Sequence, residues 1–181
     1  MSSSSTRFRK IPKVTFLIFL VTVIITGLQF FFPALIPVLE RTPEALAARQ
    51  WWRLITPVFI NPEGWRQITF NFLGIAIAGT MVERLFGGRR WLILYFVGGF
   101  VGEIAGFAWQ PIGAGSSVAV CGLVGALVAW MLSRKRFQLR FGGIILLTGS
   151  LILIALRDLH GPPLIAGTIM GLFMLFQGPL N

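Results

Sequence analysis

Two residues that could form a nucleophile–base pair stand at the heads of two apolar runs in this 181-residue sequence. Ser117 follows Gly113-Ala114-Gly115-Ser116 and leads into apolar residues that continue to Trp130, whereas His160, the single histidine of the chain, begins a later apolar run. A serine hydroxyl is a weak nucleophile until a neighbouring base takes its proton. The pair can perform hydrolytic chemistry only if the fold brings both side chains to the same depth.

Each of these residues also has an ordinary structural interpretation. A serine at the start of a helix commonly caps the free backbone N–H groups there, and a histidine at a helix interface can simply bond a carbonyl. An ionisable side chain within a membrane zone nevertheless indicates a function by default. Taken singly, neither Ser117 nor His160 decides between the two interpretations, so the elements that carry them must be placed.

The composition is that of a membrane protein. Hydrophobic residues make up 55% of the chain and the mean hydropathy is +0.80, while charged residues make up 12%, about half their usual share in a soluble domain. A soluble fold of this size could not bury so much apolar surface. We therefore expect an integral membrane protein surrounded by a lipid bilayer.

The composition also narrows the chemistry. A single cysteine, Cys121, excludes a disulfide within the chain, and one histidine without a cluster of acids argues against a metal site. We expect no metal and no other cofactor. The formal net charge of +10 could indicate nucleic acid, but the basic residues stand at the ends of the apolar runs, as loop charges of membrane proteins do. We therefore expect no nucleic-acid partner.

Six apolar runs indicate an all-α polytopic membrane protein with six transmembrane helices, since a span needs roughly 20 apolar residues. We expect these spans at about residues 14–38, 65–85, 91–109, 116–132, 141–156 and 160–176. Residues 1–13 form a basic cytoplasmic tail, and residues 14–181 form a single six-helix membrane domain. Residues 39–64 form an outer loop whose aromatic and aliphatic residues are typical of a segment at the membrane interface.

Lys and Arg residues are distributed unequally between the two sides of these spans. Eleven of the 16 fall on the side of the N-terminus and five on the other side. Positive charge accumulates in cytoplasmic loops, so we expect both the N- and the C-terminus in the cytoplasm. The fourth and sixth spans then begin at the extracytoplasmic face, and Ser117 and His160 enter the membrane from the same side.

Small residues predict that the fourth and sixth helices touch. Cys121 and Gly125 follow Ser117 at intervals of four, and glycines follow His160 at seven and eleven residues, so each set returns to one helix face. Membrane helices approach closely where such residues line the contact. Ser117 therefore stands at the top of one small-residue stripe and His160 at the top of the other.

With these motifs, the chain resembles the rhomboid family of intramembrane serine proteases over nearly its whole length. The family's Gly-x-Ser-Gly is similar to Gly115-Ser116-Ser117-Val118, and this register selects Ser117 rather than Ser116. The family's histidine on the last helix, with glycines at +7 and +11, is similar to His160. The remaining matches are a Trp-Arg in the first loop, a His-x-x-x-Asn on the second helix and an acid near its cytoplasmic end, here Trp52-Arg53, Gln67-Ile68-Thr69-Phe70-Asn71 and Glu83.

The resemblance implies an intramembrane serine endopeptidase that cleaves transmembrane segments of membrane proteins. Ser117 would attack the peptide carbonyl, with His160 as general base and then general acid and with no third carboxylate, so that the pair forms a dyad rather than a triad. Asn71, with Gln67, would donate to the oxyanion. The compact six-helix form implies the bacterial inner (plasma) membrane, with the active site toward the extracytoplasmic side.

Water must reach Ser117 for hydrolysis. We therefore expect a cavity, open to the outside, that is lined by the polar residues Gln67, Asn71, Ser116 and Thr69.

Four residues depart from the family's pattern. Gln67 replaces the usual oxyanion-side histidine, Val118 replaces the glycine after the nucleophile, Cys121 stands where an aromatic often stacks on the catalytic histidine, and Pro163 replaces a small residue. These departures leave a second hypothesis, a catalytically inactive rhomboid-like protein that binds membrane-protein helices.

Glu103 lies in the middle of the third span among glycines. A buried acid there should be protonated or bonded to a neighbour, and we expect a structural hydrogen bond across helices. A small transporter or channel using Glu103 is a third hypothesis. The sequence leaves the oligomeric state open.

Overall fold

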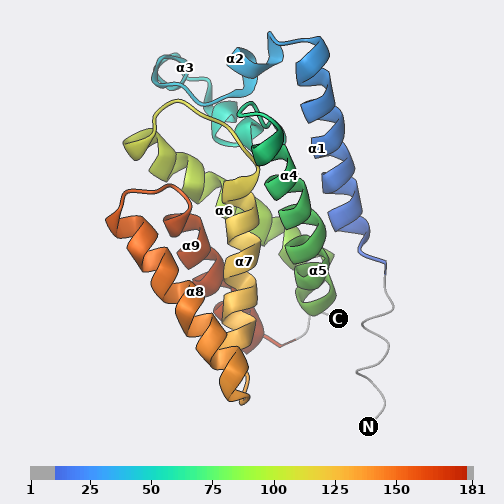
Figure 1. The fold of residues 1–181 in the computed structure, drawn as a ribbon, viewed down its shortest axis with the longest axis vertical. Coiled ribbons are helices and arrows are strands. Elements are labelled where there is room, and N and C mark those ends of the chain that lie inside the picture. Colours follow the sequence, from blue (N-terminus) through green and yellow to red (C-terminus); the bar gives the residue numbers. More distant parts are fainter. Residues whose placement is uncertain (1–10, 179–181) are drawn as a thin grey trace.

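The computed structural model describes residues 11–178, and within them the chain is a bundle of helices joined by loops (Figure 1). The only β-type pairing in that range is an isolated antiparallel bridge between Arg41 and Gly113. In chain order the elements are α1 (Lys13–Phe31), α2 (Leu35–Leu39), α3 (Pro43–Ala47), the 3₁₀ turns η2 (Trp51–Leu54) and η3 (Thr56–Phe59), α4 (Trp65–Gly74), the π turn η4 (Ile75–Gly79), α5 (Thr80–Phe86), α6 (Gly88–Trp109), α7 (Ser117–Leu132), α8 (Phe137–Ala155) and α9 (Gly161–Phe176).

The first helix is shorter than its predicted span of residues 14–38. α1 ends at Phe31, and the apolar run continues as the separate short helix α2. Pro33 accounts for the break, because proline lacks a backbone N–H and disfavours helical backbone at the residue before it. Phe32 accordingly leaves the helical region, with φ −128° and ψ 76°. Residues 1–10 of the predicted basic tail lie outside the described residues, and Lys13 is already helical.

The second predicted span, residues 65–85, corresponds to α4, η4 and α5, which follow one another without a loop. Glu83 of α5 holds the beginning of α1, since its carboxylate accepts the backbone N–H groups of Val14 (3.0 Å) and Thr15 (2.7 Å). A helix beginning has free N–H groups and favours negative charge nearby. Glu83 therefore fixes the first helix against the second.

The other four helices lie close to their predicted spans. α6 and α8 begin three and four residues earlier than expected, at Gly88 and Phe137, because basic residues enter their first turns. Arg90, one of these, is buried and donates to the carbonyl of Gly178 (2.6 Å). α7 and α9 begin within one residue of the predicted positions.

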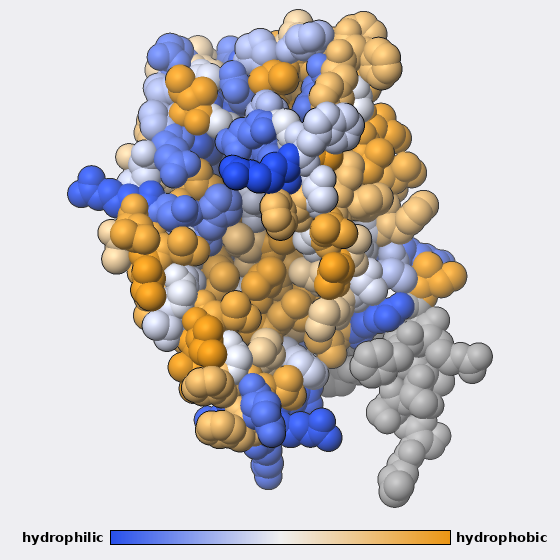
Figure 2. Space-filling model, viewed as in Figure 1, coloured by the Kyte–Doolittle hydropathy of each residue, from blue (hydrophilic) through white to orange (hydrophobic). Residues whose placement is uncertain are grey.

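Four helical segments are long and apolar enough to cross a membrane, judged by length and composition over residues 11–178: Lys13–Phe31, Trp65–Phe86, Gly88–Trp109 and Phe137–Ala155. α7 and α9 are shorter, with 16 residues each, or about 24 Å at 1.5 Å per residue. The surface fits a bilayer, because Figure 2 shows hydrophobic residues across the middle of the visible face and hydrophilic residues toward both ends.

α7 lies inside the bundle, between α6, α8 and α9 (Figure 1). Glycines permit this packing: a Cβ at Gly98 of α6 would lie 2.6 Å from the Cα of Gly122, and one at Gly167 of α9 would collide with the Gly122 carbonyl. A Cβ at Gly171 of α9 would likewise lie 2.9 Å from the Cα of Ala126. The predicted close approach of the fourth and sixth helices is confirmed.

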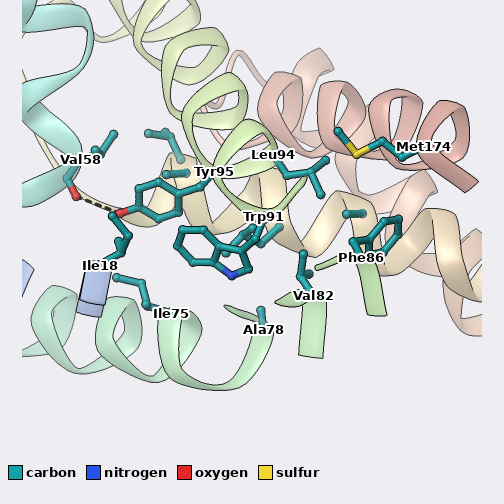
Figure 3. Close-up of a cluster of buried hydrophobic side chains, with 14 residues drawn as sticks. Ile18, Val58, Ile75, Ala78, Val82, Phe86, Trp91, Leu94, Tyr95 and Met174 are labelled. Atoms are coloured by element: carbon teal, nitrogen blue, oxygen red, sulfur yellow. Dashed lines mark hydrogen bonds between the residues drawn. The ribbon is translucent and has the colours of Figure 1, made fainter. Parts of the chain in front are cut away.

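The core joins α6 to the outer loop (Figure 3). Trp91 and Tyr95 stack with ring centroids 4.9 Å apart, and both are fully buried. The Trp91 indole N–H donates to the carbonyl of Gly79 (2.9 Å), and the Tyr95 hydroxyl donates to the carbonyl of Val58 (3.3 Å). Buried aromatic residues with a polar end need such partners. The Tyr95 bond holds the outer loop on the bundle, and the Trp91 bond joins α6 to η4.

The outer loop of residues 39–64 is folded rather than irregular. Arg53, which is buried, donates from Nη1 to the carbonyls of Pro37 (2.6 Å) and Glu40 (2.9 Å), and from Nε to Gln50 (2.7 Å). Trp51 and Trp52 remain exposed, as expected of aromatic residues at a membrane interface. The Arg53 side chain thus ties the beginning of the loop, at Pro37 and Glu40, to Gln50.

Candidate active site

Ser117 and His160 meet at the beginnings of two neighbouring helices. Ser117 is the first residue of α7 and His160 precedes the first residue of α9. The Ser117 Oγ lies 2.9 Å from the His160 Nε2, which is hydrogen-bonding distance for a nucleophile and its base. The two residues that the sequence analysis paired are brought together by the fold.

The neighbouring serine has a different position. Ser116 occupies the N-cap position of α7 without a capping side-chain bond, and it is fully buried. Its hydroxyl lies 3.4 Å from the Asn61 Oδ1 and is not among the groups that line the cavity described below. The geometry therefore separates the two serines, and only the Ser117 hydroxyl lies within hydrogen-bonding distance of the His160 ring.

A third polar side chain contacts the histidine, contrary to the expectation of a pair without a carboxylate. The Asp158 Oδ1 lies 2.7 Å from the His160 Nδ1, on the opposite side of the ring from Ser117. Partial burial raises the pKa of Asp158, but hydrogen bonds from the backbone and ring of His160 outweigh this and lower it below its ordinary value. Asp158 is thus an ionised acceptor at neutral pH. The only signal in the sequence was the Asp-x-His spacing just before α9.

Asn71 and Gln67 approach the same point from α4. A Cβ placed on Gly115 would lie 2.7 Å from the Gln67 Nε2, 3.5 Å from the Ser117 Oγ and 3.6 Å from the Asn71 Nδ2. The three polar atoms thus gather where a side chain at position 115 would begin. The Gln67 side chain is held there by donating to the Ala114 carbonyl (2.9 Å) and accepting the backbone N–H of Glu63 (3.0 Å).

Asn61 connects this site to α1, and the sequence analysis did not single it out. Its Oδ1 accepts from the Asn71 Nδ2 (2.6 Å), and its Nδ2 donates to the Thr26 hydroxyl (2.9 Å). Gln29 of α1 bonds the backbone of Asn61 in both directions, at 2.7 Å and 3.1 Å. Asn61 is fully buried. A polar residue in a loop has no periodicity, and only the fold shows that it is enclosed.

A cavity of about 330 Å³ opens beside Ser117 and His160. Gln67 and Asn71 line it as predicted, but Ser116 and Thr69 do not. Thr69 lies on the exposed face of α4. The remaining polar wall comes from other residues, among them Arg41, Glu63, Arg66, Glu103 and Gln110.

Arg41 and Glu103 form a buried ion pair at the cavity wall. Arg41 also donates to the Gln110 carbonyl (2.7 Å), and its backbone exchanges both hydrogen bonds with Gly113. The expected structural partner of Glu103 therefore exists, but it comes from the outer loop rather than from a neighbouring helix. The pair fastens the loop to α6 and to the segment that leads to Ser117.

The fold accommodates two of the four departures. Val118 is buried against Gly102 of α6, where an added Cβ would lie 2.6 Å from the Val118 Cγ1. Gly102 thus makes the room that a valine after the nucleophile needs. Pro163 lies in the first turn of α9, where its missing N–H has no helical partner to lose.

In the part of the chain that the structure describes, no three His, Cys, Asp or Glu side chains are grouped to hold a metal ion.

The chain is similar in sequence to known proteins. Residues 48–177 match the rhomboid domain. The chain is 35% identical over 133 residues to the rhomboid protease GluP of Bacillus subtilis (strain 168), covering 71% of this chain and 26% of GluP. It is 33% identical over 138 residues to the rhomboid-family protein YdcA of the same strain, covering 72% of this chain and 68% of YdcA. RHOMBOID-like protein 6, mitochondrial, of Arabidopsis thaliana is 30% identical over 156 residues, or 75% of this chain and 50% of that protein.

Proposed function

This chain belongs to the rhomboid family, and from that premise we propose that it is an intramembrane serine endopeptidase in which Ser117 is the nucleophile and His160 the base. The observation that carries the proposal is the distance of 2.9 Å between the Ser117 Oγ and the His160 Nε2. The cavity beside the pair and the convergence of Asn71 and Gln67 on Gly115 support it.

The reaction follows from this arrangement. The Ser117 oxygen bonds to the carbonyl carbon of the substrate peptide while its proton moves to the His160 Nε2. The same proton then passes to the leaving amine as the C–N bond breaks, which leaves an acyl ester on Ser117. Water, losing a proton to Nε2, attacks the ester; the proton returns to Oγ as the acid product leaves.

Stabilisation of the oxyanion is assigned to three donors. The Asn71 amide has two N–H groups, of which Asn61 accepts one, so the other is free for the developing negative charge. The Gln67 amide likewise gives one N–H to Ala114. The backbone N–H of Ser117, at the beginning of α7, has no helical acceptor. Removing one such donor from a serine hydrolase costs about 10²–10³ in rate.

In the proposed membrane arrangement all six helices span a bacterial plasma membrane, with both termini cytoplasmic and the cavity open to the extracytoplasmic side. α7, at about 24 Å, is shorter than a hydrocarbon core of about 30 Å. If its C-terminal end, followed by Arg134 and Lys135, lies at the cytoplasmic surface, Ser117 lies below the opposite surface. The substrates are transmembrane segments of membrane proteins, cut near their extracytoplasmic ends.

Purified protein in lipid vesicles tests this function. A panel of single-span substrates should be cleaved by the natural chain and by Ser116→Ala, but not by Ser117→Ala or His160→Ala. The adjacent serine is the matched control, because its hydroxyl is buried and has no base. Equal cleavage by Ser117→Ala, or loss of cleavage only in Ser116→Ala, would contradict the assignment.

The second candidate function is an inactive rhomboid-like protein that binds membrane-protein helices. The observations that favour it are two of the departures, Gln67 in place of the family's usual histidine and Cys121 in place of an aromatic residue. In that case the substrates should bind to the natural chain without being cut, and binding should be unchanged in Ser117→Ala. The transport hypothesis relied on Glu103 and on the glycine-rich helices. Glu103 is paired with Arg41, and glycines such as Gly98 and Gly167 lie at helix contacts, so neither feature favours transport.

A further inference from the structure

We infer that Asp158 is a positioning residue of this site, which holds His160 in the one tautomer that can accept the proton of Ser117. The inference rests on the proposed function. It extends the expected pair to an arrangement of three side chains, in which the carboxylate acts through the histidine and does not touch the substrate.

One carboxylate oxygen makes both of the relevant contacts. The Asp158 Oδ1 accepts the backbone N–H of His160 (2.9 Å) and lies 2.7 Å from its ring Nδ1. The other ring nitrogen, Nε2, lies 2.9 Å from the Ser117 Oγ. The imidazole therefore contacts the carboxylate through Nδ1 and the serine hydroxyl through Nε2.

The backbone of Asp158 is fixed independently of the ring. Arg157 has a left-handed conformation (φ 57°) and turns the chain after α8. The Asp158 N–H then donates to the Leu153 carbonyl (2.9 Å), and its carbonyl accepts from the N–H of Gly161 (3.3 Å). The turn that leads into α9 thus fixes the backbone that carries the carboxylate, without any contribution from the His160 ring.

The tautomer follows from the chemistry of the partners. A neutral imidazole carries one proton, and an ionised carboxylate can only accept. The proton must therefore lie on Nδ1, between the ring and Asp158, which leaves the lone pair of Nε2 toward Ser117. When Nε2 takes the serine proton, the Nδ1 proton stays in place and the imidazolium lies beside a negative charge.

The size of the effect is limited by solvent. The side chains of His160 and Asp158 are 37% and 36% exposed, and exposed charges interact weakly. In a serine protease with a buried Ser-His-Asp triad, replacing the aspartate lowers kcat about 10⁴-fold. For Asp158→Ala we expect a smaller loss, about 10- to 100-fold in kcat, with KM nearly unchanged because Asp158 does not contact the substrate.

Because the chain has one histidine, nuclear magnetic resonance can read the tautomer without assignment. With ¹⁵N-labelled histidine, every ring signal belongs to His160. In the natural protein near neutral pH the proton should be found on Nδ1. Asp158→Ala should move a large part of the population to the Nε2-protonated form. Asp158→Asn should move at least as much, because its NH₂ group can donate to Nδ1 and favour the proton on Nε2.

The kinetic arm compares kcat and KM of Asp158→Ala and Asp158→Asn with those of Glu44→Gln, which removes an exposed carboxylate on α3. Thermal unfolding of each variant shows whether the fold is kept, and Asp158→Asn preserves the shape if Asp158→Ala does not fold. An unchanged tautomer, or an unchanged kcat, in the folded Asp158 variants overturns the inference. A natural protein that cuts nothing refutes the proposed function instead, while the tautomer still reports whether Asp158 orients the ring.

Discussion

The amide nitrogen of Asn71 lies 2.6 Å from the side-chain oxygen of Asn61. This hydrogen bond joins the outer loop to the group that we propose as an oxyanion donor, and it also decides the orientation of the Asn71 amide. Because Asn61 presents an oxygen, Asn71 must present its NH₂ group to the site. A loop residue therefore fixes which face of Asn71 is available to a substrate.

Replacement of Asn61 should impair catalysis more than binding. In Asn61→Ala the Asn71 amide is free to rotate, so we expect kcat to fall about tenfold with little change in KM, a smaller loss than the 10²–10³ expected for Asn71→Ala. Thr26→Ala removes the other end of the same network without touching Asn71 and should leave kcat within about twofold. The kinetics of the three variants on one substrate check this. Equal losses in Asn61→Ala and Thr26→Ala would point to a general loss of structure.

Gly102→Ala should disturb the nucleophile from the neighbouring helix. The added methyl group would lie 2.6 Å from the Val118 Cγ1, and overpacking of this kind costs about 1–3 kcal/mol. We expect lower stability and at least a tenfold loss of cleavage, because Val118 follows Ser117 directly. Val118→Gly in the same chain removes the collision and should restore a large part of the activity. If the double variant is no better than Gly102→Ala, the contact is not the cause.

The close contact of α7 and α9 should be sensitive to one methyl group. A Cβ at Gly167 would collide with the Gly122 carbonyl, whereas one at Gly149 of α8 meets nothing within 4 Å. Gly167→Ala should therefore lower the thermal midpoint and separate Ser117 from His160, with loss of cleavage. Gly149→Ala should keep both, since alanine is favoured in helices by up to about 1 kcal/mol. Similar behaviour of the two variants would contradict the packing described here.

Removing one charge of the buried Arg41–Glu103 pair should lower the stability of the protein more than removing both charges. Arg41→Ala leaves the carboxylate of Glu103 without a partner inside the protein, and breaking a buried pair costs about 3–5 kcal/mol. Arg41→Met combined with Glu103→Gln removes both charges and should unfold at a higher temperature than Arg41→Ala. Thermal unfolding in one detergent compares the two. The reverse order would mean that Glu103 carries no charge in the folded protein.

The sequence predicted those parts of the molecule that depend on periodicity and order. The helix beginnings at Ser117 and Gly161, the common face of Ser117 and His160, and the glycine contact between α7 and α9 all follow from hydrophobic runs, loop charge and small-residue spacing. The family resemblance added Gln67 and Asn71, which the fold places around Gly115. The helices themselves therefore carry most of the information about where the site lies.

The parts that were missed depend on backbone geometry outside helices. Asp158 reaches the ring of His160 only because a turn folds back before α9, and Asn61 is enclosed only once the outer loop lies on α1. The break after Phe31 comes from Pro33, whose effect within a long apolar run was underestimated. Thr69 was expected at the cavity from its polarity, although its place on α4 turns it outward.

Labelling with a fluorophosphonate probe, followed by mass spectrometry of the modified peptide, tests the central claim most directly, because the probe reacts only with a serine whose proton a base can take. We expect modification of Ser117 in the natural protein and in Ser116→Ala, and none in His160→Ala. Modification of Ser116, or equal modification of Ser117 with and without His160, would contradict it.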